Sequence, residues 1–142
     1  MALHLEIITP EKVILSDEVD EILVPTPKGQ IGILPHHIAL LTELSSGELI
    51  IKKGTHEQFL AVAGGYLQVA NNKVTILADY AIHSDNIEIA KAEEAKQRAE
   101  HLMKEKISEE DFAEAQAQLQ RSLLELHVAK RRRSRKPNLP NT

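Results

Sequence analysis

The apolar residues of this chain change their spacing near residue 85, and this change constrains the fold more than any other feature. Before it, apolar residues form short runs that alternate with polar residues, which is the period of a half-buried β-strand. After it, apolar residues recur every three or four positions, which is the period of an amphipathic helix. The sequence therefore predicts three parts: a β-domain at 1–85, a helical domain at 86–133 and a disordered polar tail at 134–142.

The β-domain contains many short apolar runs separated by turn residues, which is typical of an antiparallel sandwich or barrel. Asn71-Asn72 lies between two runs and suits a two-residue hairpin loop, because asparagine tolerates a positive φ. Gly64-Gly65 marks a tight connection between two strands. We expect nine or ten strands, and the residues of the first strand that face the core are Leu3, Leu5 and Ile7.

In the helical domain, the sequence predicts two helices that form an antiparallel hairpin. One face of the first helix carries mostly small side chains, at Ala92, Ala95, Ala99, Leu102 and Met103. Ser108, followed by three carboxylates, is typical of a helix start, so the second helix begins there and runs to about Lys130 or slightly beyond. Its apolar stripe is Phe112, Ala115, Leu119, Leu123 and Leu126.

The alanine face of the first helix bears on whether the hairpin can move. Burying a leucine side chain contributes roughly 1.5–3 kcal/mol, whereas one buried methyl group contributes only about 0.8 kcal/mol. A hairpin held by alanines can therefore differ from an extended form by a few kcal/mol, which a partner can reverse. Two interpretations stay open: a permanently folded hairpin whose alanines allow close packing, and a movable one.

The basic excess of the chain lies entirely at its end. Residues 1–85 have a net charge of −6 and residues 86–129 of −4, whereas residues 130–142 have a net charge of +6. A helix C-terminus explains one or two cations through the helix dipole, but not six. An acidic protein surface, nucleic acid phosphates or an anionic bilayer would each suit this basic cluster. Its members are Lys130, Arg131, Arg132, Arg133, Arg135 and Lys136.

Several kinds of site are missing from the sequence. The chain has no cysteine, which excludes a disulfide framework, a thiolate metal site and a cysteine nucleophile. His36 and His37, read as neighbours on one strand, would point to opposite faces, so we predict no metal site. No motif assembles a catalytic centre, and no apolar run approaches the ~20 residues that span a bilayer. We therefore expect no catalytic residues and no membrane-spanning segment.

Four segments, taken in order, resemble the epsilon subunit of the F-type ATP synthase. They are Gly29–Leu41, Gly64–Val69, Asn72–Asp79 and Ala95–Glu100. The resemblance covers residues 3–130 and implies a ten-stranded antiparallel β-sandwich followed by a two-helix antiparallel hairpin. It implies a non-catalytic rotor subunit of the central stalk, in an enzyme that couples proton flow to ATP synthesis. The implied partners are the gamma subunit, the ring of membrane c subunits and the catalytic alpha and beta subunits, whose ATP hydrolysis the hairpin would inhibit.

The resemblance also implies site residues. Contact with the ring and the gamma subunit would fall on Lys28, Gly29, Gln30 and His37, although acidic residues are frequent in that loop and this chain has Lys28 and Gln30 instead. Some bacterial members bind ATP through an Ile-Asp-x-x-Arg-Ala stretch, where this chain has glutamate and lysine in place of aspartate and arginine. We therefore expect no cofactor. The alternative that the resemblance implies is regulatory ATP, with contacts at Ile87, Glu88, Lys91, Ala92, Arg98 and Arg121.

The resemblance implies a peripheral position on the cytoplasmic face of a bacterial inner membrane, with attachment to the membrane only through the complex and no binding of nucleic acid. The basic cluster would then act as an electrostatic latch on acidic segments of the catalytic subunits. The alternative is a small β-scaffold protein that binds nucleic acid through its basic tail. The net charge of −4 and the scarcity of aromatic residues, two Phe and two Tyr, oppose this alternative.

Overall fold

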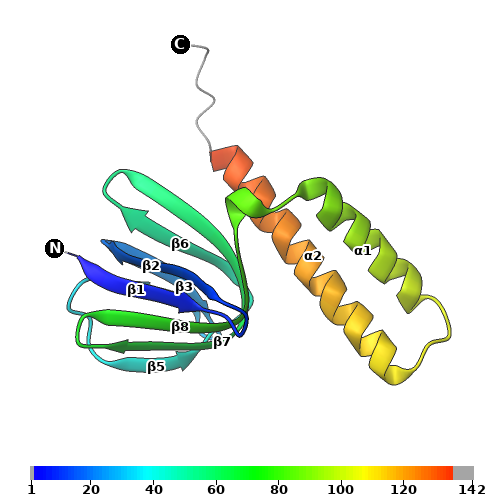
Figure 1. Cartoon of the computed structure of the whole chain (residues 1–142), viewed down its shortest axis with the longest axis horizontal. Coiled ribbons are helices and arrows are strands. Elements are labelled where there is room, and N and C mark those ends of the chain that lie inside the picture. Colours follow the sequence, from blue (N-terminus) through cyan, green and yellow to red (C-terminus); the bar gives the residue numbers. More distant parts are fainter. Residues whose placement is uncertain (1, 136–142) are drawn as a thin grey trace, which may run out of the picture. The chain divides into compact units, whose positions relative to one another are not determined.

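The structure, a computed structural model, describes the backbone of residues 2–135 and the side chains as far as Arg131. The chain forms two compact units, one ending at His83 and one beginning at Ser84. The first unit consists of strands and the second of helices (Figure 1). The fold predicted from the sequence, a β-sandwich followed by a two-helix hairpin, is therefore confirmed.

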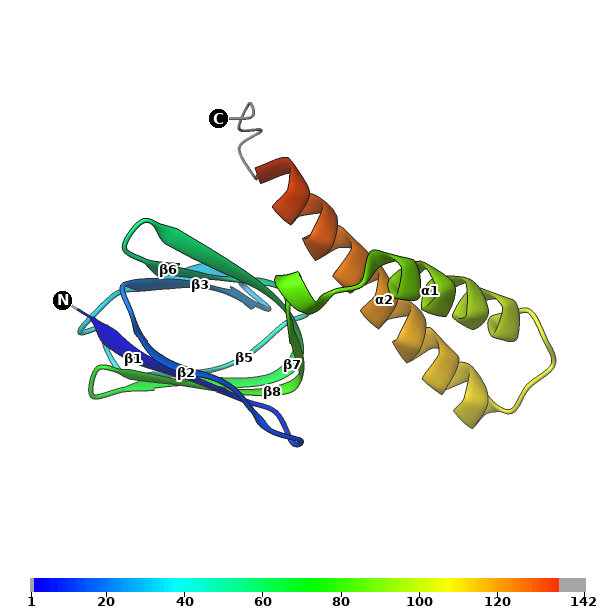
Figure 2. The ribbon, with the colours of Figure 1, turned by 45° about the horizontal axis from the view of Figure 1, so that its top comes forward.

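The first unit is a single hydrogen-bonded sheet that folds over on itself into two layers. Its strands follow the order β2-β1-β8-β7-β6-β3-β4, and β5 pairs with β7 at the side. Figure 2 shows β3 and β6 in one layer and β1, β2 and β8 in the other. The pair β1 and β8 is parallel, and the other pairs are antiparallel. The strands are β1 (Leu3–Ile8), β2 (Val13–Val19), β3 (Glu21–Thr26), β4 (Gly29–Ile33), β5 (Leu40–Glu43), β6 (Gly47–Lys53), β7 (His56–Ala70) and β8 (Lys73–His83).

The long strand β7 explains why the sandwich has eight strands and not the nine or ten predicted. Its first half pairs with β6 and its second half with β5, while β8 pairs with both halves in one register. The bend between the halves contains Gly64 and Gly65, with φ values of +69° and +114°. A Cβ atom on Gly65 would fall on the carbonyl oxygen of Leu77, so only glycine allows β7 and β8 to approach this closely. The glycine pair bends the strand without ending it.

Alternation places one face of each strand in the core, as the sequence predicts. The core of the sandwich lies between the two layers, and its residues from β1 are Leu3, Leu5 and Ile7, which are at most 1% exposed. The loop between β7 and β8 also agrees with the prediction. Ala70 pairs with Lys73, and the two residues between them, Asn71 and Asn72, have φ values of +51° and +60°.

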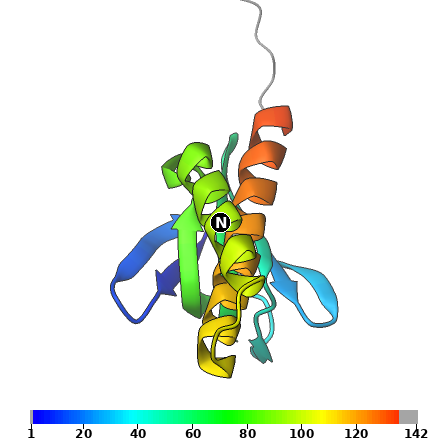
Figure 3. The same cartoon turned by 90° about the vertical axis from the view of Figure 1, so that its right-hand side faces the viewer.

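The second unit begins with a short 3₁₀ turn, Ser84–Asn86, and continues with α1 (Ile89–Met103) and α2 (Glu109–Arg135). The two helices lie side by side and antiparallel (Figure 3). The predicted helix start is confirmed, because the Asp111 N–H donates to the Ser108 hydroxyl oxygen at 3.1 Å. Ser134 and Arg135, predicted to begin a disordered tail, are the last residues of α2, and 136–142 lie outside the described residues.

Candidate functional site

The loop predicted to contact the ring and the gamma subunit is the tight turn between β3 and β4. The Thr26 hydroxyl donates to the Gly29 carbonyl oxygen at 2.6 Å and accepts from the Lys28 N–H at 3.3 Å. Thr26 is buried, whereas Lys28, Gly29 and Gln30 are exposed. A buried hydroxyl therefore fixes the backbone of a loop that presents one cation and one amide to solvent.

His37 lies at the end of a turn that begins at Leu34. The His37 N–H donates to the Leu34 carbonyl oxygen at 3.2 Å, and the ring Nδ1 lies 2.8 Å from the Ile38 carbonyl oxygen. Because a carbonyl can only accept, Nδ1 carries the proton in this hydrogen bond. The prediction that His36 and His37 are neighbours on a strand is wrong. β4 ends at Ile33, and Pro35, which has no N–H, cannot continue the ladder.

Large apolar side chains are exposed in this turn and shortly after it. Ile38 is 80% exposed and Leu41 is 72% exposed, and Leu34 also faces solvent. Exposed apolar patches on a small protein mark interaction sites more often than isolated apolar residues do. None of these three residues was a site candidate from the sequence. The apolar run at 38–41 could have indicated them, because consecutive apolar residues cannot all face the core of a half-buried strand.

A second exposed apolar set runs across the outer face of the sandwich. In the strand register, Tyr66 on β7 pairs with Leu77 on β8, Leu77 pairs with Ile8 on β1, and Ile8 pairs with Val13 on β2. Tyr66, Leu77 and Val13 are each between 51% and 57% exposed. We call these four residues the outer apolar row. No local pattern in the sequence indicates this row, because its residues become neighbours only once the strands are placed in register.

The residues predicted to contact ATP lie directly before α1, on α1 and on α2. Glu88 and Lys91 come together, since the Lys91 Nζ lies 3.2 Å from the Glu88 Oε2. Ile87 and Ala92 are buried, at 9% and 3% exposure, so their side chains offer little surface to a ligand. Arg98 lies two helical turns beyond Lys91 on α1, Arg121 lies on α2, and both are exposed. Binding of ATP stays a prediction.

The basic cluster occupies the end of α2. Lys130 and Arg131 are exposed. Arg132, Arg133 and Arg135 belong to the helix, but their side chains, and Lys136 as a whole, lie outside the described residues.

Within 2–135, no helix is both long enough and apolar enough to cross a membrane. In the same part of the chain, no three His, Asp or Glu side chains gather in a way that would hold a metal ion.

Comparison with known families accounts for both units. The family described as "ATP synthase, Delta/Epsilon chain, beta-sandwich domain" matches residues 2–84, and "ATP synthase, Delta/Epsilon chain, long alpha-helix domain" matches residues 85–130. The ATP synthase epsilon chain of Herpetosiphon aurantiacus is 45% identical, over 95% of this chain and 99% of that one. The epsilon chain of Chloroflexus aggregans is 49% identical, over 91% of this chain and 93% of that one.

Solved structures share the fold at low sequence identity. One chain of the Euglena gracilis mitochondrial ATP synthase (OSCP/F1/c-ring) is similar with a TM-score of 0.65 and 19% identity, over 94% of this chain and 80% of that one. A chain from the central stalk and c-ring of the Tetrahymena thermophila mitochondrial enzyme is similar with a TM-score of 0.57 and 18% identity, over 89% and 95%. From the family matches and the relatives that align over nearly its whole length, the chain belongs to the ATP synthase epsilon chain family, a non-catalytic subunit of that enzyme.

Proposed function

We propose that this chain is a central-stalk subunit of a rotary ATP synthase, held on the rotor by its sandwich and able to restrain ATP hydrolysis through its hairpin. Family membership supports the assignment to the enzyme, and the similar Tetrahymena chain comes from a structure of the central stalk and c-ring. The proposed partners are the gamma subunit, the ring of c subunits and the catalytic alpha and beta subunits. The chain is peripheral, on the cytoplasmic face of a bacterial membrane, and attached to that membrane only through the complex.

The surface of the sandwich supports a binding role. The exposed loop Lys28–Gln30, the turn before His37 and the outer apolar row all belong to a unit with a continuous buried core. Binding sites on a rigid scaffold lose little conformational entropy when a partner docks. We assign contact with the gamma subunit and the ring to this unit.

The construction of the hairpin is the observation that carries the regulatory part of the proposal. Small side chains predominate among the described buried residues of the two helices, which are Ala92 and Ala99 on α1 and Ala115, Ser122, Leu126, Val128 and Ala129 on α2. The Ser122 hydroxyl donates to the Gln118 carbonyl oxygen of its own helix at 2.9 Å, so this hydrogen bond does not hold α2 to α1. Small side chains bury little area each, which leaves the packed and extended forms close in free energy.

Larger apolar side chains of the hairpin face solvent. Phe112 and Leu123 on α2 are 40% and 45% exposed, and Leu102 on α1 is also exposed. The hairpin thus holds itself together partly with small residues and presents large ones outward. This arrangement favours a helix pair that exchanges its internal contacts for contacts with a partner.

The basic cluster provides the electrostatic part of the same mechanism. Six cations within seven residues, on a chain that is otherwise acidic, suit an acidic surface of the catalytic subunits. Exposed ion pairs contribute about 0.2–1 kcal/mol each, so six together can shift a balanced equilibrium by roughly tenfold or more. We infer that the cluster stabilises the inhibitory form of the hairpin.

Replacement of all six basic residues by glutamine, followed by reassembly of the ATP synthase, tests this function. We expect hydrolysis of ATP by the complex to rise severalfold, with the chain still bound, because the sandwich is unchanged. Lys104→Gln with Lys106→Gln, in the turn between the helices, is the control and should leave hydrolysis unchanged. Equal hydrolysis by the six-fold variant and the wild type would exclude the latch. Failure of the wild-type chain to join the complex would exclude the central-stalk assignment itself.

A further inference from the structure

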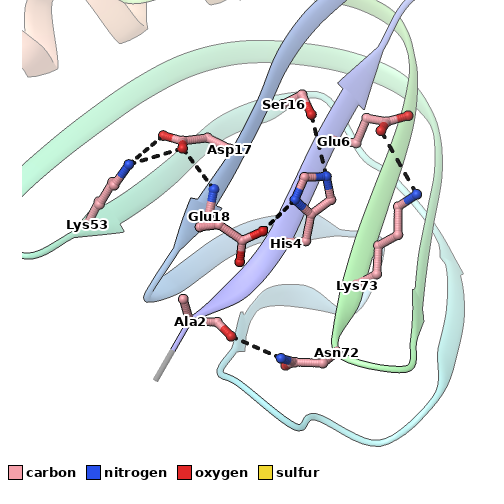
Figure 4. Close-up of polar contacts among 9 residues, drawn as sticks. All are labelled: Ala2, His4, Glu6, Ser16, Asp17, Glu18, Lys53, Asn72 and Lys73. Carbon is pink, nitrogen blue, oxygen red and sulfur yellow. Dashed lines mark hydrogen bonds and ion pairs between the residues drawn. The ribbon is translucent and has the colours of Figure 1, made fainter.

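The side chain of Asn72 connects three segments that are far apart in the sequence. Its Oδ1 accepts a hydrogen bond from the His36 N–H at 2.8 Å. Its Nδ2 donates to the Ala2 carbonyl oxygen at 2.9 Å, as Figure 4 shows. The Asn72 backbone carbonyl accepts from the His4 N–H at 3.2 Å. The loop between β7 and β8 is thereby tied to the start of β1 and to the turn that precedes His37.

The turn at 34–37 has little of its own to hold it. His36 has a φ of +65°, a backbone conformation that disfavours residues with a side chain. The hydrogen bond within the turn, from the His37 N–H to the Leu34 carbonyl oxygen, is 3.2 Å long. The bond from the His36 N–H to Asn72 is shorter, at 2.8 Å, and joins the turn to a loop 36 residues away. The contact with Asn72 therefore defines where this turn lies on the sandwich.

This turn carries part of the surface assigned above to rotor contact. Leu34 is its first residue, His37 is its last, and Ile38 follows it directly. The side chains of Leu34 and Ile38 are exposed. If the turn were loose, these groups would have to be ordered when a partner docks, and that ordering would weaken binding.

We propose that Asn72 is a positioning residue for the rotor-contact surface: its side chain fixes the turn 34–37 before docking, so that Leu34, His37 and Ile38 are already in place. The proposal rests on the proposed function. It assigns a binding role to a residue that does not itself belong to the contact surface.

The loop offers a closely matched pair of variants. Asn72→Gly removes the side-chain bridge, and glycine adopts a φ of +60° without strain. Asn71→Gly makes the same change at the neighbouring position, φ +51°, where the side chain makes no hydrogen bond among the described residues. Asn72→Asp keeps an oxygen that accepts from the His36 N–H and loses the donor to Ala2, so it separates the two bonds.

The experiment measures three quantities on the full-length chain: affinity for an ATP synthase depleted of this subunit, the melting temperature, and hydrogen exchange of the His36 amide by NMR. A hydrogen bond contributes about a three- to tenfold change in an equilibrium constant. We expect Asn72→Gly to bind three- to tenfold more weakly than Asn71→Gly, with faster exchange at His36 and a melting temperature lower by only a few degrees. Asn72→Asp should restore both the affinity and the slow exchange.

Each contrary result has a distinct meaning. If exchange at His36 is unchanged in Asn72→Gly, the side chain does not hold the turn and the proposal is wrong. If exchange at His36 is faster in Asn72→Gly but its affinity equals that of Asn71→Gly, the order of the turn does not set binding and the proposal is wrong. The proposal is also wrong if Asn72→Asp binds as weakly as Asn72→Gly. If the wild-type chain does not bind the depleted enzyme, the proposed function fails, while the exchange data still report on the turn.

Discussion

At the scale of single residues, the ion pair between Asp17 and Lys53 closes one open edge of the sandwich. Asp17 lies on β2, an end strand of the sheet, and Lys53 is the last residue of β6 in the other layer. The Lys53 Nζ lies 3.0 Å and 2.9 Å from the two carboxylate oxygens of Asp17 (Figure 4). The hydrogen bond from Lys53, followed by that from the Glu18 N–H, holds the pKa of Asp17 below its usual value.

This lowered pKa predicts a pH-dependent effect of Asp17→Asn. A carboxyl whose pKa is lower in the folded state stabilises the fold above its unfolded pKa of about 3.9 and loses that contribution as the pH falls through its folded pKa. We expect Asp17→Asn to lower the melting temperature at pH 7, with a difference from wild type that shrinks as the pH falls below the unfolded pKa of about 3.9. Glu11→Gln, an exposed carboxylate, is the control for the charge change alone. If the melting temperatures of Asp17→Asn and the wild type differ equally at pH 7 and at acidic pH, the ion pair is not the cause of the difference.

Backbone conformations and hydrogen bonds were predictable from the sequence where they involve residues close together in the chain. The positive φ values at Asn71 and Asn72 follow from the preference of asparagine for such loops, and the cap at Ser108 follows from its own short segment. The contact from Asn72 to His36 spans 36 positions and involves a turn that was read as a strand. Such contacts depend on how strands are placed in space, which no local pattern encodes.

At the scale of elements, the close packing of α1 and α2 depends on small side chains at buried positions. Ala115→Leu adds three carbon atoms to a residue that is 4% exposed, and overpacking of this kind costs about 1–3 kcal/mol. We expect amide exchange in α1 to accelerate about 5- to 150-fold as the helices separate more often. On the proposed function, the reassembled synthase should then hydrolyse ATP more slowly, because the extended hairpin is favoured.

Ala117→Leu is the matched control for this prediction. Ala117 lies two residues further along α2 and is exposed, so the same substitution should change stability by no more than about 0.5 kcal/mol. Similar exchange rates in α1 for the two variants would mean that the buried alanines do not limit the packing of the hairpin.

The sequence predicted helices and strands correctly where a local pattern or a capping residue marks them. The apolar period placed both helices, the cap at Ser108 placed the start of α2, and alternation assigned the inward residues of β1. The number of strands was overestimated because Gly64-Gly65 ends an apolar run without ending the strand. The outer apolar row escaped prediction for a related reason. Tyr66, Leu77 and Val13 become neighbours only through a register that joins β7, β8, β1 and β2.

At the scale of the whole molecule, the separation of charge divides the chain by role. Residues 1–85 are acidic overall, and the last thirteen residues contain six cations and no acidic residue. Within one chain, such an asymmetry guides association with an oppositely charged partner more than it stabilises the fold. The sandwich binds, on our proposal, through shape and apolar contact, whereas the end of α2 acts through charge. The two interactions should therefore respond differently to salt.

Salt separates these contributions in the assembled enzyme. The Debye length falls from about 30 Å at 0.01 M to about 3 Å at 1 M ionic strength, so an exposed basic cluster loses its attraction over this range. We expect ATP hydrolysis by the wild-type complex to rise with salt until it approaches that of the complex carrying six glutamines. The ratio of the two rates, measured on the same preparation of catalytic subunits, removes direct effects of salt on the catalytic sites. Because apolar contacts are not weakened by salt, the chain itself should stay bound throughout. A ratio that does not change with salt would show that the basic cluster acts through some contact other than charge.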